Sequence, residues 1–117
     1  GDRTHFVHLR SCYIFPNGNF TEASHLGGRG HLIELCRIFE KAEQEGKCNS
    51  GRRLPMRVDH GMTFTDEPGG VFDESNHGHN AGYTLLGRMF AMGQIQGVIA
   101  TVDDELGIEY KQPGFYD

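Results

Sequence analysis

The chain has 117 residues, with 11 basic and 16 acidic side chains and a formal net charge of −5 at pH 7. Nucleic-acid binding is not expected, because phosphate recognition needs clustered Lys and Arg and the sequence shows no basic stripe. No segment resembles a signal peptide or a membrane span, and three cysteines form no even disulfide framework, so we expect a cytoplasmic protein that does not bind membranes.

The first half predicts one strand and one helix. Residues 5–14 alternate in the manner of a strand, and Pro16 to Asn19 have the composition of a turn. Residues 20–26 are expected to be short and irregular. Apolar residues at helical spacing predict an amphipathic helix over 31–45 that ends at Gly46.

The second half predicts the same order again. Residues 54–59 form the second strand, residues 61–81 a long polar loop, and residues 82–102 the second helix. Gly87, Gly93 and Gly97 are expected to let this helix pack closely against a sheet. Its expected buried side consists of Leu85, Leu86, Met89, Phe90, Met92, Ile95, Val98 and Ile99.

The order strand–helix–strand–helix predicts an α/β fold with parallel strands and a right-handed crossover. Two parallel strands cannot cover both faces of their own sheet. We therefore expect residues 1–117 to be part of a larger sheet protein.

Chemistry is expected at the end of the second strand, in the run Met56-Arg57-Val58-Asp59-His60-Gly61. Alternation puts Arg57 and Asp59 on one face. Parallel pairing would bring His8 and Arg10 to the same surface, where an imidazole and a carboxylate could bind a divalent metal. The alternative interpretation is a structural ion pair between Asp59 and Arg57.

Tyr83 is a further candidate, because it lies at the start of the second helix and a tyrosine hydroxyl can transfer a proton near a metal. Its alternative interpretation is an aromatic residue packed on the loop.

Two protein ligands are too few for a metal, so additional ligands are needed. The nitrogen ligand favours Mn²⁺, Fe²⁺ or Zn²⁺ over Ca²⁺.

Four blocks of this sequence resemble the C-terminal part of the D-mannonate dehydratase family. They are His5-Phe6-Val7-His8-Leu9-Arg10, Phe20-Thr21-Glu22-Ala23-Ser24-His25-Leu26, the run 56–61, and Asn80-Ala81-Gly82-Tyr83 with Leu86-Gly87-Arg88. Their order and spacing cover nearly the whole chain. Val58 departs from the family, which commonly has Pro there.

The resemblance implies a (β/α)₈ barrel, of which this chain would supply the C-terminal βαβα part. It implies that His8 and Asp59 are metal ligands and that His60 and Tyr83 are the acid and base, without assigning which is which. Arg57 and Arg10 are expected to bind the substrate's carboxylate. The family's other protein ligands, a His and a Cys on earlier strands, are absent from this chain.

The implied activity is metal-dependent dehydration of D-mannonate to 2-keto-3-deoxy-D-gluconate in hexuronate catabolism. The expected metal is Mn²⁺, with Mg²⁺ or Fe²⁺ as alternatives, and the expected assembly is a homo-oligomer. One alternative is another metal-dependent sugar isomerase or epimerase on the same barrel. The other is a non-catalytic, self-associating fragment.

Overall fold

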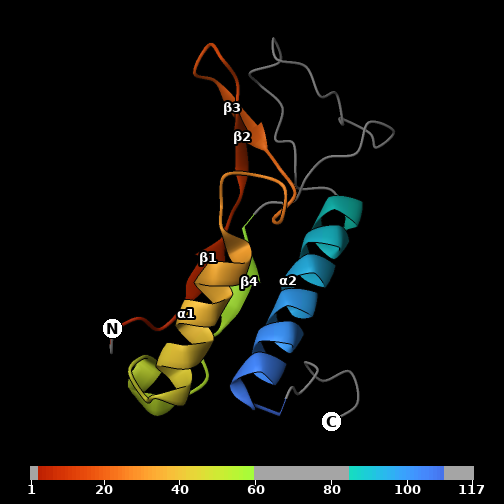
Figure 1. Cartoon of the computed structure of the whole chain (residues 1–117). Helices are drawn as coiled ribbons and strands as arrows, with labels where there is room; N and C mark the ends of the chain where they lie inside the picture. The colour runs from red at the N-terminus through yellow and green to blue at the C-terminus, as the bar shows by residue number, and fades with distance from the viewer. Residues whose placement is uncertain (1–2, 60–84, 110–117) are drawn as a thin grey trace.

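The computed structural model describes residues 3–59 and 85–109, and its elements follow one another as Figure 1 shows. They are strands β1 (Val7–Leu9), β2 (Cys12–Ile14) and β3 (Phe20–Glu22), helix α1 (Leu32–Gln44), the 3-10 turn η1 (Asn49–Gly51), strand β4 (Met56–Val58) and helix α2 (Leu85–Leu106). The fold is mixed α/β. The expected order of strand, helix, strand and helix is confirmed, with an additional hairpin.

The parallel pair is β1 with β4, as predicted. The register matches Val7 with Met56, His8 with Arg57 and Leu9 with Val58. The apolar members of both strands face α1 and α2, which leaves the opposite face to His8 and Arg57.

The single strand predicted over residues 5–14 is wrong, because the chain changes sheets at Arg10 and Ser11. β2 pairs antiparallel with β3 in a separate hairpin, whose turn uses Gly18 at a φ of +90°. Residues 20–26 are therefore not irregular throughout. Ser11 is buried at the corner, where its carbonyl accepts a hydrogen bond from the Ala23 amide.

Both predicted helices are confirmed, although α2 ends four residues later than expected. α1 ends just before Gly46, which takes a φ of +67°. α2 continues through Asp103 to Leu106 and is followed by Gly107 at +68°. The acidic residues near its end indicate a solvated terminus by composition, but Asp103 is completely buried.

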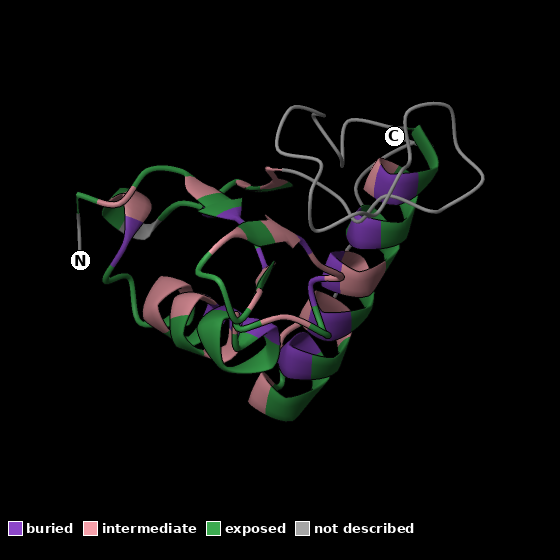
Figure 2. Cartoon of the chain, turned by 90° about the horizontal axis from the view of Figure 1, so that it is seen from above, coloured by how far each residue is buried: buried purple, intermediate pink, exposed green. Residues whose placement is uncertain are grey.

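Of the eight apolar residues predicted to form the buried side of α2, two are buried and five are exposed. Ile95 and Val98 are buried, whereas the large apolar residues of the first two turns are exposed, namely Leu85, Leu86, Met89, Phe90 and Met92. α2 is apolar on several sides, so periodicity alone does not select the side that packs. Figure 2 shows the buried positions on the side of α2 turned toward the other elements.

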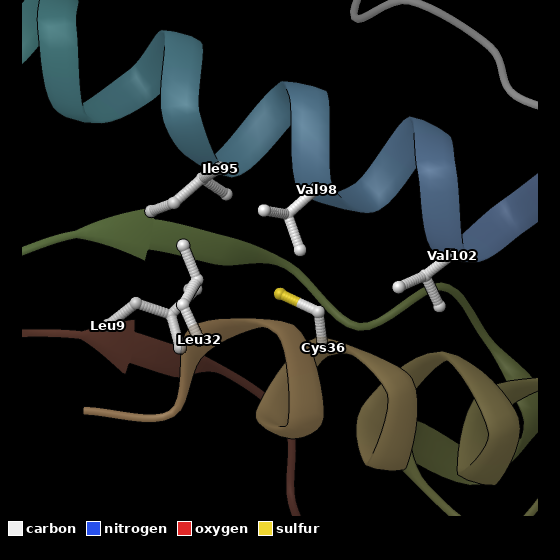
Figure 3. Close-up of a cluster of buried hydrophobic side chains, with 6 residues drawn as sticks. All are labelled: Leu9, Leu32, Cys36, Ile95, Val98 and Val102. Atoms are coloured by element: carbon white, nitrogen blue, oxygen red, sulfur yellow. The ribbon is translucent and has the colours of Figure 1, made fainter. Parts of the chain in front are cut away.

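The core lies between the two helices and the apolar face of the parallel pair. Figure 3 shows its buried members, which are Leu9, Leu32, Cys36, Ile95, Val98 and Val102. Val7, Met56 and Val58 pack against this cluster. Burial raises the pKa of the Cys36 thiol to about 11, as expected for a cysteine that serves the core.

Gly93 and Gly97 of α2 do not have the packing role predicted for them, whereas Gly87 is buried. A Cβ added at Gly93 or Gly97 would meet nothing within 4 Å. These two positions instead form part of a shallow apolar groove beside Leu26 and Ile33.

α2 is also long and apolar enough to cross a membrane by length and composition alone, contrary to the expectation from sequence. Its most apolar 18-residue window has a mean hydropathy of 1.2, and 28% of that window is buried. Core helices of soluble proteins pass the same test. Like such a core helix, α2 packs one side against α1 and β4.

A buried acidic pair joins α1 to α2 near their C-terminal ends. Glu40 and Asp103 are both buried, and the Arg53 guanidinium lies 3.7 Å from Glu40 Oε2 and 3.6 Å from Asp103 Oδ2. The pKa of the Glu40 carboxyl is raised to about 7, mainly by burial; Arg53 opposes this shift, and the Asp103 and Glu43 carboxylates add to it. Folding therefore favours the protonated form of Glu40.

We expect the stability of the Glu40→Gln variant to improve relative to that of the parent as the pH rises. The Glu40 carboxyl binds its proton more tightly in the folded chain than at its ordinary pKa of 4.5. Its stabilising contribution is present below pH 4.5 and is lost as the pH rises to about 7, whereas an amide does not titrate. Between pH 4.5 and pH 8, the free energy of unfolding of the variant should rise by about 1 to 3 kcal/mol relative to that of the parent.

Urea unfolding at the two pH values measures this gain, with the exposed Asp104→Asn as the matched control on α2. A difference between Glu40→Gln and the parent that does not change with pH would show that folding does not raise the pKa of Glu40.

Candidate active-site edge

His8 and Asp59 meet at the carboxyl edge of the parallel pair. Nδ1 of His8 lies 3.8 Å from Oδ1 of Asp59, and both side chains are partly exposed. The Asp59 amide donates to the Leu9 carbonyl at 3.1 Å, which continues the ladder past β4. The prediction that these two side chains share a face of parallel strands is confirmed.

The two side chains suit a divalent metal by type and by separation. An imidazole nitrogen and a carboxylate oxygen are common ligands of Mn²⁺ and related ions. Neighbouring ligands of an octahedral ion with bonds near 2.1 Å lie roughly 3 Å apart, so a small rotation of either side chain would bring 3.8 Å into range. Among the described residues there is no group of three or more potential metal ligands. The pair is therefore a partial site.

Arg57 does not form the structural ion pair considered as the alternative. Its Nε donates to the Val58 carbonyl at 3.4 Å, and none of the ion pairs within residues 3–59 and 85–109 joins it to Asp59. Its side chain is exposed on the same open face as His8. Arg57 thus lies beside the edge with a guanidinium that could reach an anionic group.

Arg10 is brought near this edge but is already paired. Its guanidinium donates a hydrogen bond to the buried carboxylate of Glu22, and it lies 5.4 Å from the centre of the Phe20 ring. The hydrogen bond with Glu22 raises the pKa of Arg10, and the nearby charge of Asp59 adds to this. The carboxylate of Glu22 offsets part of the positive charge that Arg10 could offer to a substrate.

The remaining predicted site residues, His60 and Tyr83, lie outside the described residues. Their predicted roles as acid and base stay predictions.

Sequence reasoning missed two buried polar residues next to the edge, Glu22 and His25. Glu22 pairs with Arg10, and Nε2 of His25 lies 2.8 Å from the Leu9 carbonyl. Both belong to the block 20–26, for which the sequence predicts a short irregular segment and a resemblance to the family but no buried polar contact. A glutamate and a histidine in a block whose other residues are uncharged were the signal available.

The comparisons with known proteins cover almost the whole chain. Residues 1–109 match the model of the D-mannonate dehydratase (UxuA) family. The chain is 33% identical over 106 residues to mannonate dehydratase 2 of Agrobacterium fabrum, and 32% identical over 105 residues to the mannonate dehydratase of Saccharophagus degradans. These matches cover 89% and 88% of this chain, which spans about a quarter (25%) of the length of each relative.

Proposed function

The chain belongs to the D-mannonate dehydratase family, and from this premise we propose that it is the C-terminal quarter of an enzyme that converts D-mannonate to 2-keto-3-deoxy-D-gluconate. The observation that carries the proposal is the convergence of His8 and Asp59 at the carboxyl edge of parallel strands. Active sites of parallel α/β proteins form at this edge.

The proposal includes a (β/α)₈ barrel. β1 and β4 would be adjacent barrel strands, with α1 and α2 on the outside and the face of His8 and Arg57 toward the barrel interior. This arrangement supplies what the described chain lacks, because the remaining strands would cover the open face and pair with the free strand edges.

In this proposal His8 and Asp59 hold a divalent metal, Mn²⁺ in the first place, together with ligands from the rest of the barrel. The bound metal supplies positive charge that stabilises the negative charge developing on the substrate. Arg57 binds the substrate carboxylate through its fork of N–H donors. Arg10, held by Glu22, adds positive charge to the same edge.

His60 and Tyr83 divide the two proton transfers. One takes the proton from the carbon beside the carboxylate, and the other protonates the hydroxyl on the next carbon, which leaves as water. The resulting enol rearranges to the 2-keto acid. We also propose a cytoplasmic location, which suits the free thiols of Cys12, Cys36 and Cys48.

We expect the isolated 117-residue chain to show no measurable dehydration of D-mannonate, because two ligands do not hold the metal. The full-length protein, meaning the longer polypeptide that the proposal implies, is expected to be active with Mn²⁺. An assay of keto-acid product compares the two.

Turnover of D-mannonate by the purified 117-residue chain would show that His8 and Asp59 do not need further ligands. A full-length protein that is inactive on D-mannonate but isomerises or epimerises another sugar would favour the alternative barrel enzyme.

A further inference from the structure

His25 lies in the turn after β3, in a segment that the proposed chemistry leaves without a role. Its side chain is only 2% exposed. The turn is held against the corner between β1 and β2, since the Ala23 amide donates to the Ser11 carbonyl and the Arg29 amide to the Cys12 carbonyl. A Cβ at Gly28 would lie 2.1 Å from Ser11 Oγ, so only glycine permits this approach. The imidazole therefore has a fixed place.

The contacts of His25 join the strands to α2. Nε2 lies 2.8 Å from the Leu9 carbonyl, and the same carbonyl accepts the Asp59 amide at 3.1 Å. The backbone amide of His25 donates to Oε1 of Gln94 on α2 at 2.9 Å. The Leu9 carbonyl oxygen thus accepts hydrogen bonds from the His25 imidazole and from the backbone amide of Asp59, a proposed metal ligand.

The direction of these bonds determines the form of the imidazole. A carbonyl can only accept, so Nε2 of His25 carries the hydrogen. Nδ1 is buried and has no hydrogen-bond partner within the described part of the chain. A second hydrogen on Nδ1 would have no acceptor among the described residues. The geometry therefore gives the His25 imidazole one hydrogen bond, from Nε2 to the Leu9 carbonyl.

We propose that His25 is a positioning residue: by holding the Leu9 carbonyl it fixes the edge at which His8 and Asp59 meet. His8 precedes Leu9 in β1, and Asp59 is bonded to Leu9 through its amide. The hydrogen bond from the His25 amide to Gln94 also ties this residue to α2, which limits movement of the imidazole away from the Leu9 carbonyl. The consequence for catalysis rests on the proposed dehydratase function, whereas the consequence for the edge itself does not.

Glu22 acts on the residue that follows Leu9. It holds the Arg10 side chain from β3, while His25 holds the Leu9 backbone from the next turn. The segment from β3 to His25 therefore contacts two successive residues of the edge with buried polar groups. Outer partners of this kind affect metal affinity by roughly 10- to 100-fold when they are replaced.

The test compares His25→Leu, which removes the donor, with His25→Gln, whose amide can reach the same carbonyl. Both variants are made in the full-length protein, and His31→Gln, an exposed histidine before α1, is the matched control. The first readout is hydrogen exchange of the Asp59 amide, compared with the Val7 amide, which donates to Pro55 at the other end of the pair. The second is Mn²⁺ affinity, and the third is the division of any loss between kcat and KM.

We expect His25→Leu to speed exchange at Asp59 by roughly tenfold or more while Val7 changes little, and to weaken Mn²⁺ binding by roughly 10- to 100-fold, with the loss in kcat rather than KM. His25→Gln should restore these values to within a few-fold, and it decides alone if the Leu variant does not fold.

Equal effects at Asp59 and Val7, or a folded His25→Gln variant as impaired as His25→Leu, would overturn the positioning role. If the unmodified full-length protein lacks dehydratase activity, the proposed function fails, and the exchange at Asp59 still decides the role of His25.

Discussion

Asp59→Ala in the full-length protein is expected to lose both Mn²⁺ affinity and turnover of D-mannonate. Asp59 supplies the carboxylate of the pair at the carboxyl edge, 3.8 Å from His8. Replacing an outer partner of a metal ligand costs roughly 10- to 100-fold in affinity or activity, so losing a ligand itself should cost at least 100-fold. Product formation measured over a series of Mn²⁺ concentrations tests this.

The control is Asp104→Ala, which removes an exposed carboxylate from α2 and should leave turnover unchanged. An Asp59→Ala variant whose lost activity returned fully at moderately higher Mn²⁺ would show that other ligands suffice. An unchanged variant would return Asp59 to a structural role beside His8.

His60→Asn is expected to fail in a different way. His60 is proposed to transfer a proton, so turnover should fall by roughly 10²- to 10⁴-fold. The asparagine amide keeps a polar group at this position, and Mn²⁺ binding should stay close to that of the parent. The keto-acid assay under saturating Mn²⁺ measures the effect.

A His60→Asn variant with near-parental turnover would remove His60 from the chemistry. A variant that lost Mn²⁺ along with turnover would instead indicate that His60 is a ligand.

The parallel pair and the meeting of His8 and Asp59 at its edge could be predicted because their pattern is local. Alternation within residues 56–59 and 7–10 sets which side chains share a face, and parallel pairing then brings His8 to Asp59. Helix α1 could be predicted as well, because its sequence has one apolar face and a glycine follows its end.

The features that sequence reasoning missed depend on distant contacts. Nothing local marks the change of sheet at Ser11, which depends on the Ala23 amide. Asp103 looks like a solvated helix end until Arg53 and Glu40 are placed beside it. The buried donor of His25 is invisible for the same reason, because its acceptor lies 16 residues away at Leu9.

Calorimetric titration of Mn²⁺ into the full-length protein, its Asp59→Ala and His60→Asn variants and the isolated 117-residue chain tests the central claim most directly. We expect tight binding by the parent and by His60→Asn, and at least roughly 100-fold weaker binding by Asp59→Ala and by the isolated chain. Equal Mn²⁺ affinity in the parent and Asp59→Ala would contradict a metal site at the carboxyl edge of β1 and β4.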